Sequence, residues 1–211
     1  VWGNVDREQA ARNLGAVLRA AGRADVPIAL GAGAPYGPAP DLSPATFVHG
    51  AHGLGQRHVT DPPATLVEEA AVDLLARSCA AAPGEITVVT LGPLSTIATA
   101  IEKHPGFARN VGRVVVMGGS IRAGGNALPI SEANVAHDPV AAQAVLTAPW
   151  RTPPLLVPLD ATYQATLDET HFEALRQHRS AAARFLDAPL HFYRTAGARL
   201  VPGRQCPCHD L

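Results

Sequence analysis

The stretch ITVVTLGPLSTIATAI, residues 86–101, decides the fold class that the sequence predicts. It opens with an apolar run rich in Ile, Val and Thr, whose length is typical of a buried strand. Gly92 and Pro93 then interrupt the run. Pro93 stands where the first residue of a helix is favoured, because proline has no N–H to leave unpaired there. We therefore interpret the stretch as a strand that leads into a helix.

The same alternation of strand and helix continues on both sides of this stretch. Buried strands are predicted for VPIAL (26–30), RVVVM (113–117) and PLLVPL (154–159), because each is a short run rich in Val, Ile and Leu. The segments between them predict helices over 7–22, over 62–82, from Pro139 with Asp138 as N-cap, and from Asp168 to about Asp187.

This alternation predicts an α/β fold, with a doubly wound, mostly parallel sheet and helices on both faces. We expect residues 1–211 to form a single domain. Ligands of such sheets bind at the carboxyl ends of the strands. The motifs LGPLS (91–95), MGG (117–119) and LDAT (159–162) each follow a predicted strand, which indicates that the site lies there.

The composition is that of a globular protein without a strong overall field. Hydrophobic residues make up 47% of the chain, charged residues 17%, and the formal net charge is −1. This balance argues against nucleic acid and anionic membranes as partners. No apolar run has the continuity of a signal peptide or a membrane span. Three cysteines do not make a disulfide framework, so we expect a cytoplasmic protein.

The richest polar segment is GNALPISEANVAHDPVAA, residues 125–142, which carries Asn126, Glu132 and Asn134 within nine residues. Amides both donate and accept hydrogen bonds, and a carboxylate accepts two donors, so this set suits the adjacent hydroxyls of a ribose. The alternative is an ordinary loop in which Asn and Ser side chains stabilise turns. The residues alone leave both interpretations open.

A glycine-rich loop, FVHGAHGLGQRH (47–58), carries His49 and His52. Three interpretations of it are open: a metal-binding pair, one functional histidine on a flexible loop, or plain surface. The pair Cys206 and Cys208 lacks the second pair of ligands that a zinc site needs, which argues against a metal or redox centre.

His209 and Asp210 are neighbours near the end of the sequence. Neighbouring residues on a helix point in different directions, so the two would have separate roles. Asp210 suits a hard metal ion, and His209 suits a proton carrier. The alternative is that Asp210 only caps a helix.

Taken in order along the chain, these segments resemble the inosine–uridine-preferring nucleoside hydrolases. The resemblance covers nearly the whole chain, and its most specific part is the block from Met117 to Ala142. The segments that carry it are GNVDREQAARNL, VPIALGAGAPYG, FVHGAHGLG, VTLGPLSTIATAI, VVVMGGSIRAGGNALPISEANVAHDPVAA, PLDATYQATL and CPCHDL.

The resemblance implies a calcium-dependent enzyme that hydrolyses the N-glycosidic bond of ribonucleosides through an oxocarbenium-like transition state. Its small-molecule partner would be a ribonucleoside, and we expect a homo-oligomer, either a dimer or a tetramer. The implied catalytic group is His209, which would protonate or orient the departing base. Ca²⁺ would be held by Asp210 and the backbone carbonyl of Leu91. The implied substrate-binding residues are Asn4, His49 on a mobile loop, Asn126, Glu132, Asn134 and Tyr193.

The sequence departs from the family's pattern most clearly by an absence. The family's Asp-x-Asp-x-x-x-Asp-Asp motif, which supplies most of the calcium carboxylates, is not found in residues 1–211. We therefore expect a chain cut at both ends, without the first strand and the C-terminal segment, and an incomplete Ca²⁺ site. Ala133 replaces a usual Phe and Thr96 a usual Asn, changes that would alter substrate preference or weaken activity.

Two alternative functions stay open. The first is a natural short paralogue that binds nucleosides, sugars or a partner protein without catalysis. The second is an unrelated nucleotide-binding α/β module. GAGAPYG (31–37) has the wrong glycine spacing for a phosphate-binding loop, which argues against the second.

Overall fold

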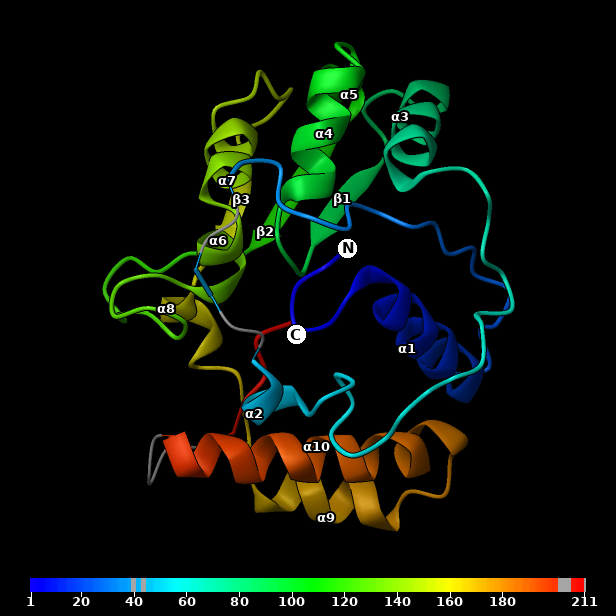
Figure 1. Cartoon of the computed structure of the whole chain (residues 1–211), viewed down its shortest axis with the longest axis vertical. Helices are drawn as coiled ribbons and strands as arrows, with labels where there is room; N and C mark the ends of the chain where they lie inside the picture. The colour runs from blue at the N-terminus through cyan, green and yellow to red at the C-terminus, as the bar shows by residue number, and fades with distance from the viewer. Residues whose placement is uncertain (39–40, 43–44, 201–205, 211) are drawn as a thin grey trace.

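The computed structural model describes residues 1–38, 41–42, 45–200 and 206–210 of the chain. Figure 1 shows how the helices and strands are arranged. In chain order they are α1 (Arg7–Ala20), α2 (Thr46–His49), α3 (Ala71–Ala81), β1 (Thr87–Thr90), α4 (Ser95–Lys103), α5 (Phe107–Asn110), β2 (Arg113–Met117), α6 (Ala133–His137), α7 (Pro139–Leu146), β3 (Leu155–Val157), α8 (Leu159–Thr162), β4 (Thr166–Leu167), α9 (Glu169–Gln177), α10 (Ala181–Leu200) and β5 (Cys206–Pro207). No helix in the described part of the chain has the length and apolar character that crossing a bilayer requires.

Three parallel strands form the main sheet, in the order β1-β2-β3. The register pairs Val88 with Val114, and Val116 with Leu156. Parallel neighbours need a crossover between them, and the segments that carry α4 and α7 supply the two crossovers. The arrangement confirms the predicted α/β fold class and the strands expected around 86–91, 113–117 and 154–159.

A second, two-stranded sheet joins distant parts of the chain. β4 and β5 run antiparallel, with Thr166 opposite Pro207 and Leu167 opposite Cys206. Cys208 N also donates to the carbonyl of Ala165 at 2.8 Å. This pairing holds the segment that carries His209 beside the end of α8.

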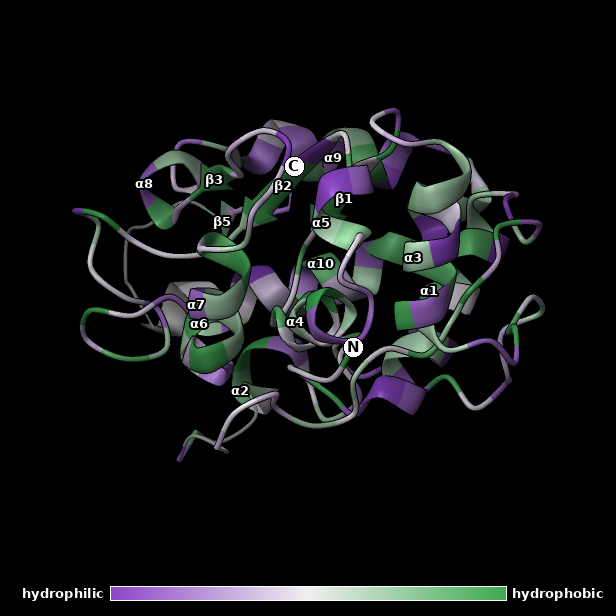
Figure 2. Cartoon of the chain, turned by 90° about the horizontal axis from the view of Figure 1, so that it is seen from above, coloured by the Kyte–Doolittle hydropathy of each residue, from purple (hydrophilic) through white to green (hydrophobic). Residues whose placement is uncertain are grey.

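One face of the main sheet carries the core. Val88, Val114 and Val116 alternate along their strands, and all three belong to one apolar cluster with residues of α3, α4, α5 and α7. Ala100 of α4 and Val145 of α7 are fully buried in this cluster. Figure 2 shows α4 and α7 on the same side of the sheet. Burial of this face is the main stabilising contribution that we identify in the fold.

The opposite face of the sheet is apolar too, yet it meets solvent. Val89, Val115 and Leu155 lie side by side across the three strands. Val89 is 56% exposed and Leu155 52% exposed, and Val115 is partly exposed between them. Parallel sheets are normally covered on both faces, so this triplet is an unusual surface for the fold class.

Two sequence predictions in the first third of the chain are wrong in detail. Residues 26–30 form no continuous strand among the described residues, because Ile28 makes only an isolated bridge, to Leu66. That bridge holds Leu66 extended. The helix expected over 62–82 therefore begins only at Ala71.

The single helix expected from Asp168 to about Asp187 is also wrong. Asp168 is the N-cap of α9 as its position suggested, but α9 ends at Gln177. His178 is extended, with φ −77° and ψ 126°. Ser180 Oγ then accepts a hydrogen bond from the N–H of Ala183 at 3.1 Å, which caps the start of a new helix, α10.

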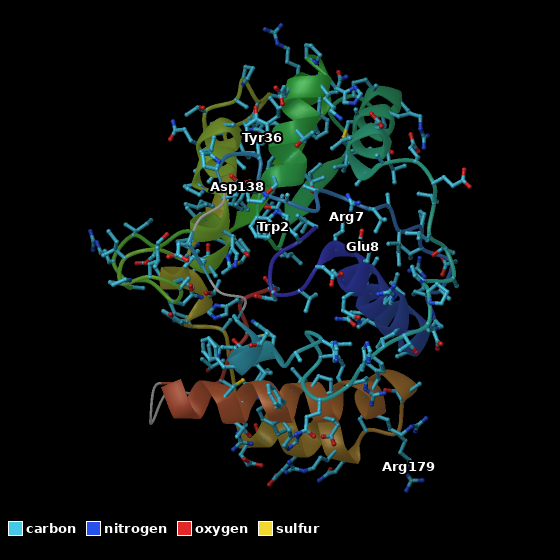
Figure 3. The ribbon with its side chains drawn as sticks, viewed as in Figure 1. Trp2, Arg7, Glu8, Tyr36, Asp138 and Arg179 are labelled. Carbon is cyan, nitrogen blue, oxygen red and sulfur yellow. The ribbon has the colours of Figure 1, made fainter. Side chains whose placement is uncertain are left out.

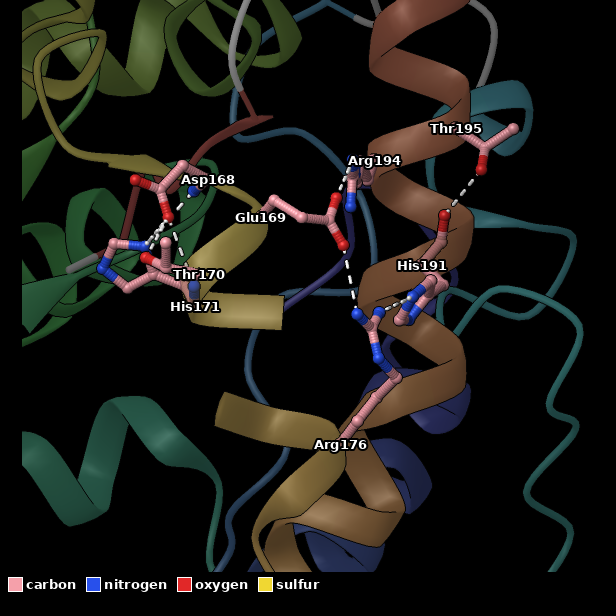
Figure 4. A network of polar contacts seen from close by, with 8 residues as sticks. All are labelled: Asp168, Glu169, Thr170, His171, Arg176, His191, Arg194 and Thr195. Atoms are coloured by element: carbon pink, nitrogen blue, oxygen red, sulfur yellow. Dashed lines mark hydrogen bonds and ion pairs between the residues drawn. The ribbon is translucent and has the colours of Figure 1, made fainter. Parts of the chain in front are cut away.

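An ion-pair cluster fastens these two helices together (Figure 4). Glu169 of α9 binds Arg176 at 3.1 Å and also pairs with Arg194 of α10. The Arg194 guanidinium lies 4.7 Å from the centre of the Phe172 ring, which is 1% exposed. The hairpin therefore combines a buried aromatic ring with a charged outer edge.

Of the two helix starts predicted at prolines, the one at Pro139 is confirmed and the one at Pro93 is displaced along the chain. Asp138 is the N-cap of α7 and Pro139 is its first residue, as predicted, and Asp138 Oδ1 accepts from the N–H of Ala141 at 3.0 Å. The helix expected at Pro93 begins at Ser95 instead. The displacement brings the Ser95 hydroxyl to the first turn of α4, where it contacts Asp138.

Asp138 does more than cap a helix. It is fully buried, and Oδ2 accepts from the Ser95 hydroxyl and from the N–H of Tyr36, both at 2.6 Å. Ser95 in turn accepts from the indole N–H of Trp2 at 3.0 Å. Figure 3 shows Trp2, Tyr36 and Asp138 in one region of the molecule, and Ser95 and Asp138 lie on the connections that leave the carboxyl ends of β1 and β2. One buried carboxylate thus ties three distant segments to the core.

Candidate functional site

Glu132 occupies the connection between β2 and α6 and is 2% exposed. It is the N-cap of α6: Oε1 accepts from the N–H of Asn134 at 2.8 Å and Oε2 from that of Val135 at 3.1 Å. Oε2 also accepts from the N–H of Gly119 at 3.0 Å. Gly119 adopts φ +78°, a conformation that favours glycine. Three backbone donors therefore fix the carboxylate at the carboxyl end of β2.

Asn126 and Asn134 lie next to Glu132. Asn126 Oδ1 accepts from the N–H of Ala133 at 2.8 Å, and Asn134 Nδ2 donates to the carbonyl of Met117 at 3.2 Å. Within the described residues, Asn126 Nδ2 and Asn134 Oδ1 make no hydrogen bond. One donor and one acceptor therefore remain for ligand hydroxyls beside a carboxylate.

The segment after β5 brings His209 and Asp210 to the same region. The Thr162 hydroxyl and His209 Nδ1 lie 2.8 Å apart, and the Tyr163 ring centre is 5.6 Å from that of His209. Burial raises the pKa of Asp210, and the negative charge of Glu132 raises it further. Asp210 and Glu132 are therefore within electrostatic reach of each other.

His49 and Tyr193 form a third part of the site. Their rings stack with centres 5.7 Å apart and planes 19° apart. Burial lowers the pKa of His49, and the neighbouring His209 lowers it further. Burial also raises the pKa of Tyr193, with a smaller contribution from the charge of Asp210. Both rings are thus neutral at pH 7 and offer flat apolar surfaces.

Two glycines let the loop after α2 close against α10. Gly50 has φ +79°, and a Cβ on it would lie 1.8 Å from the carbonyl oxygen of Gly55. A Cβ on Gly55 would lie 2.9 Å from the Cβ of Phe192. Larger residues at either position would push His49 away from its place beside α10.

Asn4 and Leu91 belong to two segments that run near each other after the start of the chain and after β1. A Cβ on Gly3 would be 3.2 Å from the Pro93 side chain, so residues 3–4 run beside the segment after β1. Asn4 is exposed, and the Leu91 residue is 52% exposed. Among the described residues, no hydrogen bond joins Asn4 or Leu91 to Glu132 or Asp210. The structure brings seven of the nine expected positions together and leaves these two without a direct link.

The model of the inosine-uridine preferring nucleoside hydrolase family matches residues 1–211. The chain belongs to this family. Probable uridine nucleosidase 2 of Arabidopsis thaliana is 35% identical over 193 residues, which make up 92% of this chain and 59% of that protein. Probable uridine nucleosidase 2 of Oryza sativa subsp. japonica is 39% identical over 196 residues, 92% of this chain and 57% of that protein.

Solved structures of nucleoside hydrolases share the fold. A plant nucleoside hydrolase is 34% identical, with a TM-score of 0.90 over 100% of this chain and 65% of that one. A purine-preferring ribonucleoside hydrolase from Gardnerella vaginalis is 29% identical, with a TM-score of 0.91 over 99% and 66%. The chain spans about three fifths of the length of the curated relatives it matches.

Sequence reasoning missed two residues of the candidate site, Thr162 and Tyr163. Thr162 is 3% exposed and hydrogen-bonds with His209, and Tyr163 packs edge-on against the same ring. The motif LDAT (159–162) was a signal, because it follows a predicted strand. Nothing in the linear sequence connects it to a histidine 47 residues away.

The described residues do not fit a complete calcium site. They contain no group of three or more His, Cys, Asp or Glu side chains that could hold a metal ion. Of the expected calcium ligands, Asp210 supplies one carboxylate. The carboxylate of Glu132 already accepts hydrogen bonds from three backbone N–H groups. Ca²⁺ prefers six to eight oxygen ligands, so these groups alone would not satisfy it.

Proposed function

We propose that this chain provides the substrate-binding half of an enzyme that hydrolyses the N-glycosidic bond of ribonucleosides to free base and ribose. The observation that carries the proposal is the convergence of Glu132 with the neighbouring pair His209 and Asp210, from two segments far apart in the sequence, onto one site. Family membership supports the reaction type. The names of the plant relatives support uridine as the first substrate to test.

The sugar would be held by Asn126, Glu132 and Asn134. The Asn126 amide donates to one hydroxyl and the Asn134 oxygen accepts from another, while the Glu132 carboxylate lies beside the ring. Cleavage of the C–N bond develops positive charge on the ribose. A fixed carboxylate favours that charge more than the neutral substrate, so Glu132 lowers the barrier rather than only binding the substrate.

The departing base would be received by the aromatic side of the site. His209 is the proton donor or hydrogen-bond donor to the base, and the contact between its Nδ1 and the Thr162 hydroxyl orients its ring. Tyr193 and His49 provide ring surfaces on which a base stacks. Proton transfer of this kind is worth roughly 10²–10⁴-fold in rate.

Asp210 and the carbonyl of Leu91 are our proposed contacts for Ca²⁺, and Asn4 a further sugar contact. Because the described oxygen ligands do not complete a calcium site, we route no step of the reaction through the ion. Calorimetry of calcium binding to the Asp210→Asn variant and to the unchanged protein tests this contact. Equal affinity of the two proteins would remove Asp210 from the ligand set.

The activity test measures release of reducing sugar from uridine and from inosine. We expect Glu132→Gln and Asn134→Ala each to lower kcat/KM by roughly 10²–10⁴-fold, because each removes a group that contacts the reacting sugar. Glu173→Gln is the matched control, since Glu173 is exposed on α9, away from the site. Unchanged turnover in the Glu132 and Asn134 variants would overturn these assignments.

A second candidate function is nucleoside binding without catalysis. The incomplete set of metal ligands favours it. Uridine binding by calorimetry, without any release of ribose over long incubation, would decide for this alternative. Loss of that binding in Asn134→Ala would place the bound nucleoside at the same site.

We further propose a homo-oligomer, a dimer or a tetramer, in the cytoplasm. The exposed apolar triplet Val89, Val115 and Leu155 supports association. Three free cysteines, of which Cys79 and Cys206 are buried, support a reducing compartment. Light scattering on the purified protein tests the first statement, and fractionation of the source cells tests the second.

A further inference from the structure

A cavity outside the candidate site is lined by none of its residues. It has a volume of about 630 Å³ and is formed between α1, residues 57–61 and the start of α10. Pockets of this size hold small organic ligands. None of the nine residues assigned above to the nucleoside site lines it.

The cavity, which we call the arginine pocket, is rich in positive charge. Arg19, Arg57 and Arg184 come from three different elements, and Asp61 is the one carboxylate on the wall. Within the described residues none of these three guanidinium groups forms an ion pair. Arg19 donates to the carbonyl of Pro62 at 3.4 Å, and Arg184 to that of Arg179.

Some arginines elsewhere in the chain are paired with carboxylates. Arg176 and Arg194 share Glu169 in the cluster of Figure 4. Others, such as Arg109 and Arg113, form no ion pair within the described residues either. The pocket is therefore distinguished by three guanidinium groups without a carboxylate partner that line one cavity. Three unpaired groups around one cavity repel each other unless solvent or an anion lies between them.

We propose that the arginine pocket binds the phosphate group of a small anion. A guanidinium presents a planar fork of donors that matches phosphate oxygens, so two or three forks from different elements define a phosphate site. The remaining walls are apolar, with Ala16, Val59 and Phe185 among them. Such walls fit the organic part of a nucleoside monophosphate, which is larger than inorganic phosphate alone.

The pocket is connected to the loop that follows α2 and His49. The His58 ring on its wall stacks on His52, with ring centres 3.7 Å apart. The Arg57 guanidinium lies 4.6 Å from the centre of the Phe185 ring of α10. A phosphate held by Arg57 and Arg184 would therefore fasten this loop to α10. This consequence rests on the proposed function, whereas phosphate binding itself does not.

The test is isothermal titration of the full chain with uridine 5′-monophosphate, inorganic phosphate and uridine at low ionic strength. We expect the monophosphate to bind, and the double variant Arg57→Gln, Arg184→Gln to weaken that binding at least tenfold. Arg109→Gln is the matched control, an exposed arginine outside the pocket, and should bind as the unchanged protein does. Higher salt should weaken binding, because the contacts are ionic.

Two further comparisons separate this inference from the nucleoside site. Glu132→Gln should bind the monophosphate with unchanged affinity if the phosphate lies in the arginine pocket, and uridine should not compete for it. Arg19→Gln removes a pocket charge without touching the Phe185 ring, so it tests the site even if the double variant is unstable. Tighter binding of the monophosphate than of inorganic phosphate identifies an organic ligand, and equal affinities identify the free anion.

The proposal is overturned by either of two results. The first is no binding of either phosphate probe to the unchanged protein. The second is binding that Glu132→Gln abolishes while the arginine variants leave it intact, because the ligand would then occupy the nucleoside site.

Discussion

The candidate site has two walls that are held in place by different interactions. The polar wall consists of Asn126, Glu132 and Asn134, and backbone N–H and carbonyl groups fix each of its side chains. The ring wall consists of His49, Tyr163, Tyr193 and His209, and ring contacts between separate elements hold it. Position in the polar wall depends on one local turn, and position in the ring wall depends on the packing of α2, α8, α10 and the segment after β5.

The difference has a consequence for how the walls respond to change. A substitution in the polar wall removes hydrogen bonds that the backbone needs, so function and stability fall together. A substitution in the ring wall removes a contact surface, and the fold around it keeps its backbone hydrogen bonds. The expected effects decrease from Glu132 through His209 to His49.

Glu132→Ala should have the largest effect. It removes the carboxylate beside the sugar, so turnover falls by roughly 10²–10⁴-fold. It also leaves three backbone N–H groups without their acceptor, which costs roughly 1–3 kcal/mol of unfolding free energy per buried group left unpaired. Urea denaturation and uridine hydrolysis measure the two losses. Glu132→Gln keeps an acceptor and should lose less stability, and a fully stable Glu132→Ala would refute the coupling.

His209→Ala should lower activity without a comparable loss of stability. The expected loss with uridine is about 10²-fold or more, because the departing base loses its proton donor. A riboside with an activated phenolic leaving group needs no proton and should react at nearly the original rate. Rates with both substrates on the same preparation decide the matter. A uniform loss with both would remove the leaving-group role.

The smallest effect should be a pH dependence of stability set by His49. Its pKa is lowered in the folded state by burial, so the unfolded chain takes up a proton first as the pH falls. Stability from this residue is complete above the ordinary histidine pKa of about 6.5 and is lost as the pH decreases below it. The melting temperature of the unchanged protein should therefore drop more between pH ~7.5 and pH ~5.5 than that of His49→Gln. If the melting temperatures of the two proteins depend on pH in the same way, the pKa of His49 is not lowered by folding.

The two walls also differ in how far the sequence predicts them. The polar wall lies within a span of nine residues that follows a strand, and strand ends are where ligands meet a parallel sheet. Residue types and spacing therefore singled out the segment, and the resemblance to the family was needed to choose a binding site over an ordinary loop. Tyr163 and Thr162 of the ring wall were missed, because only the pairing of β4 with β5 brings them to His209. Such contacts depend on tertiary packing, and local patterns carry no information about them.

The same limit explains the errors in the fold. The strands of the main sheet were predicted correctly because each is a short apolar run rich in Val, Ile and Leu. In the structure each of these runs also pairs with a neighbouring strand. Residues 26–30 have the same composition, yet Ile28 has only a single bridge to Leu66 in the described chain, so no ladder forms. The break before α10 depends on the Ser180 side chain capping a new helix, which the periodicity of the apolar residues does not reveal.

The uncovered sheet face has a consequence for the thermodynamics of unfolding. Val89, Val115 and Leu155 are already partly in water in the folded chain, so unfolding exposes less new apolar surface there than in a sheet covered on both faces. The heat-capacity change of unfolding follows newly exposed apolar area, at about 12–15 cal/mol/K per residue for ordinary domains. The denaturant m-value follows the same area. Both quantities should fall below what the length of the chain suggests, and the curve of stability against temperature should be correspondingly flat.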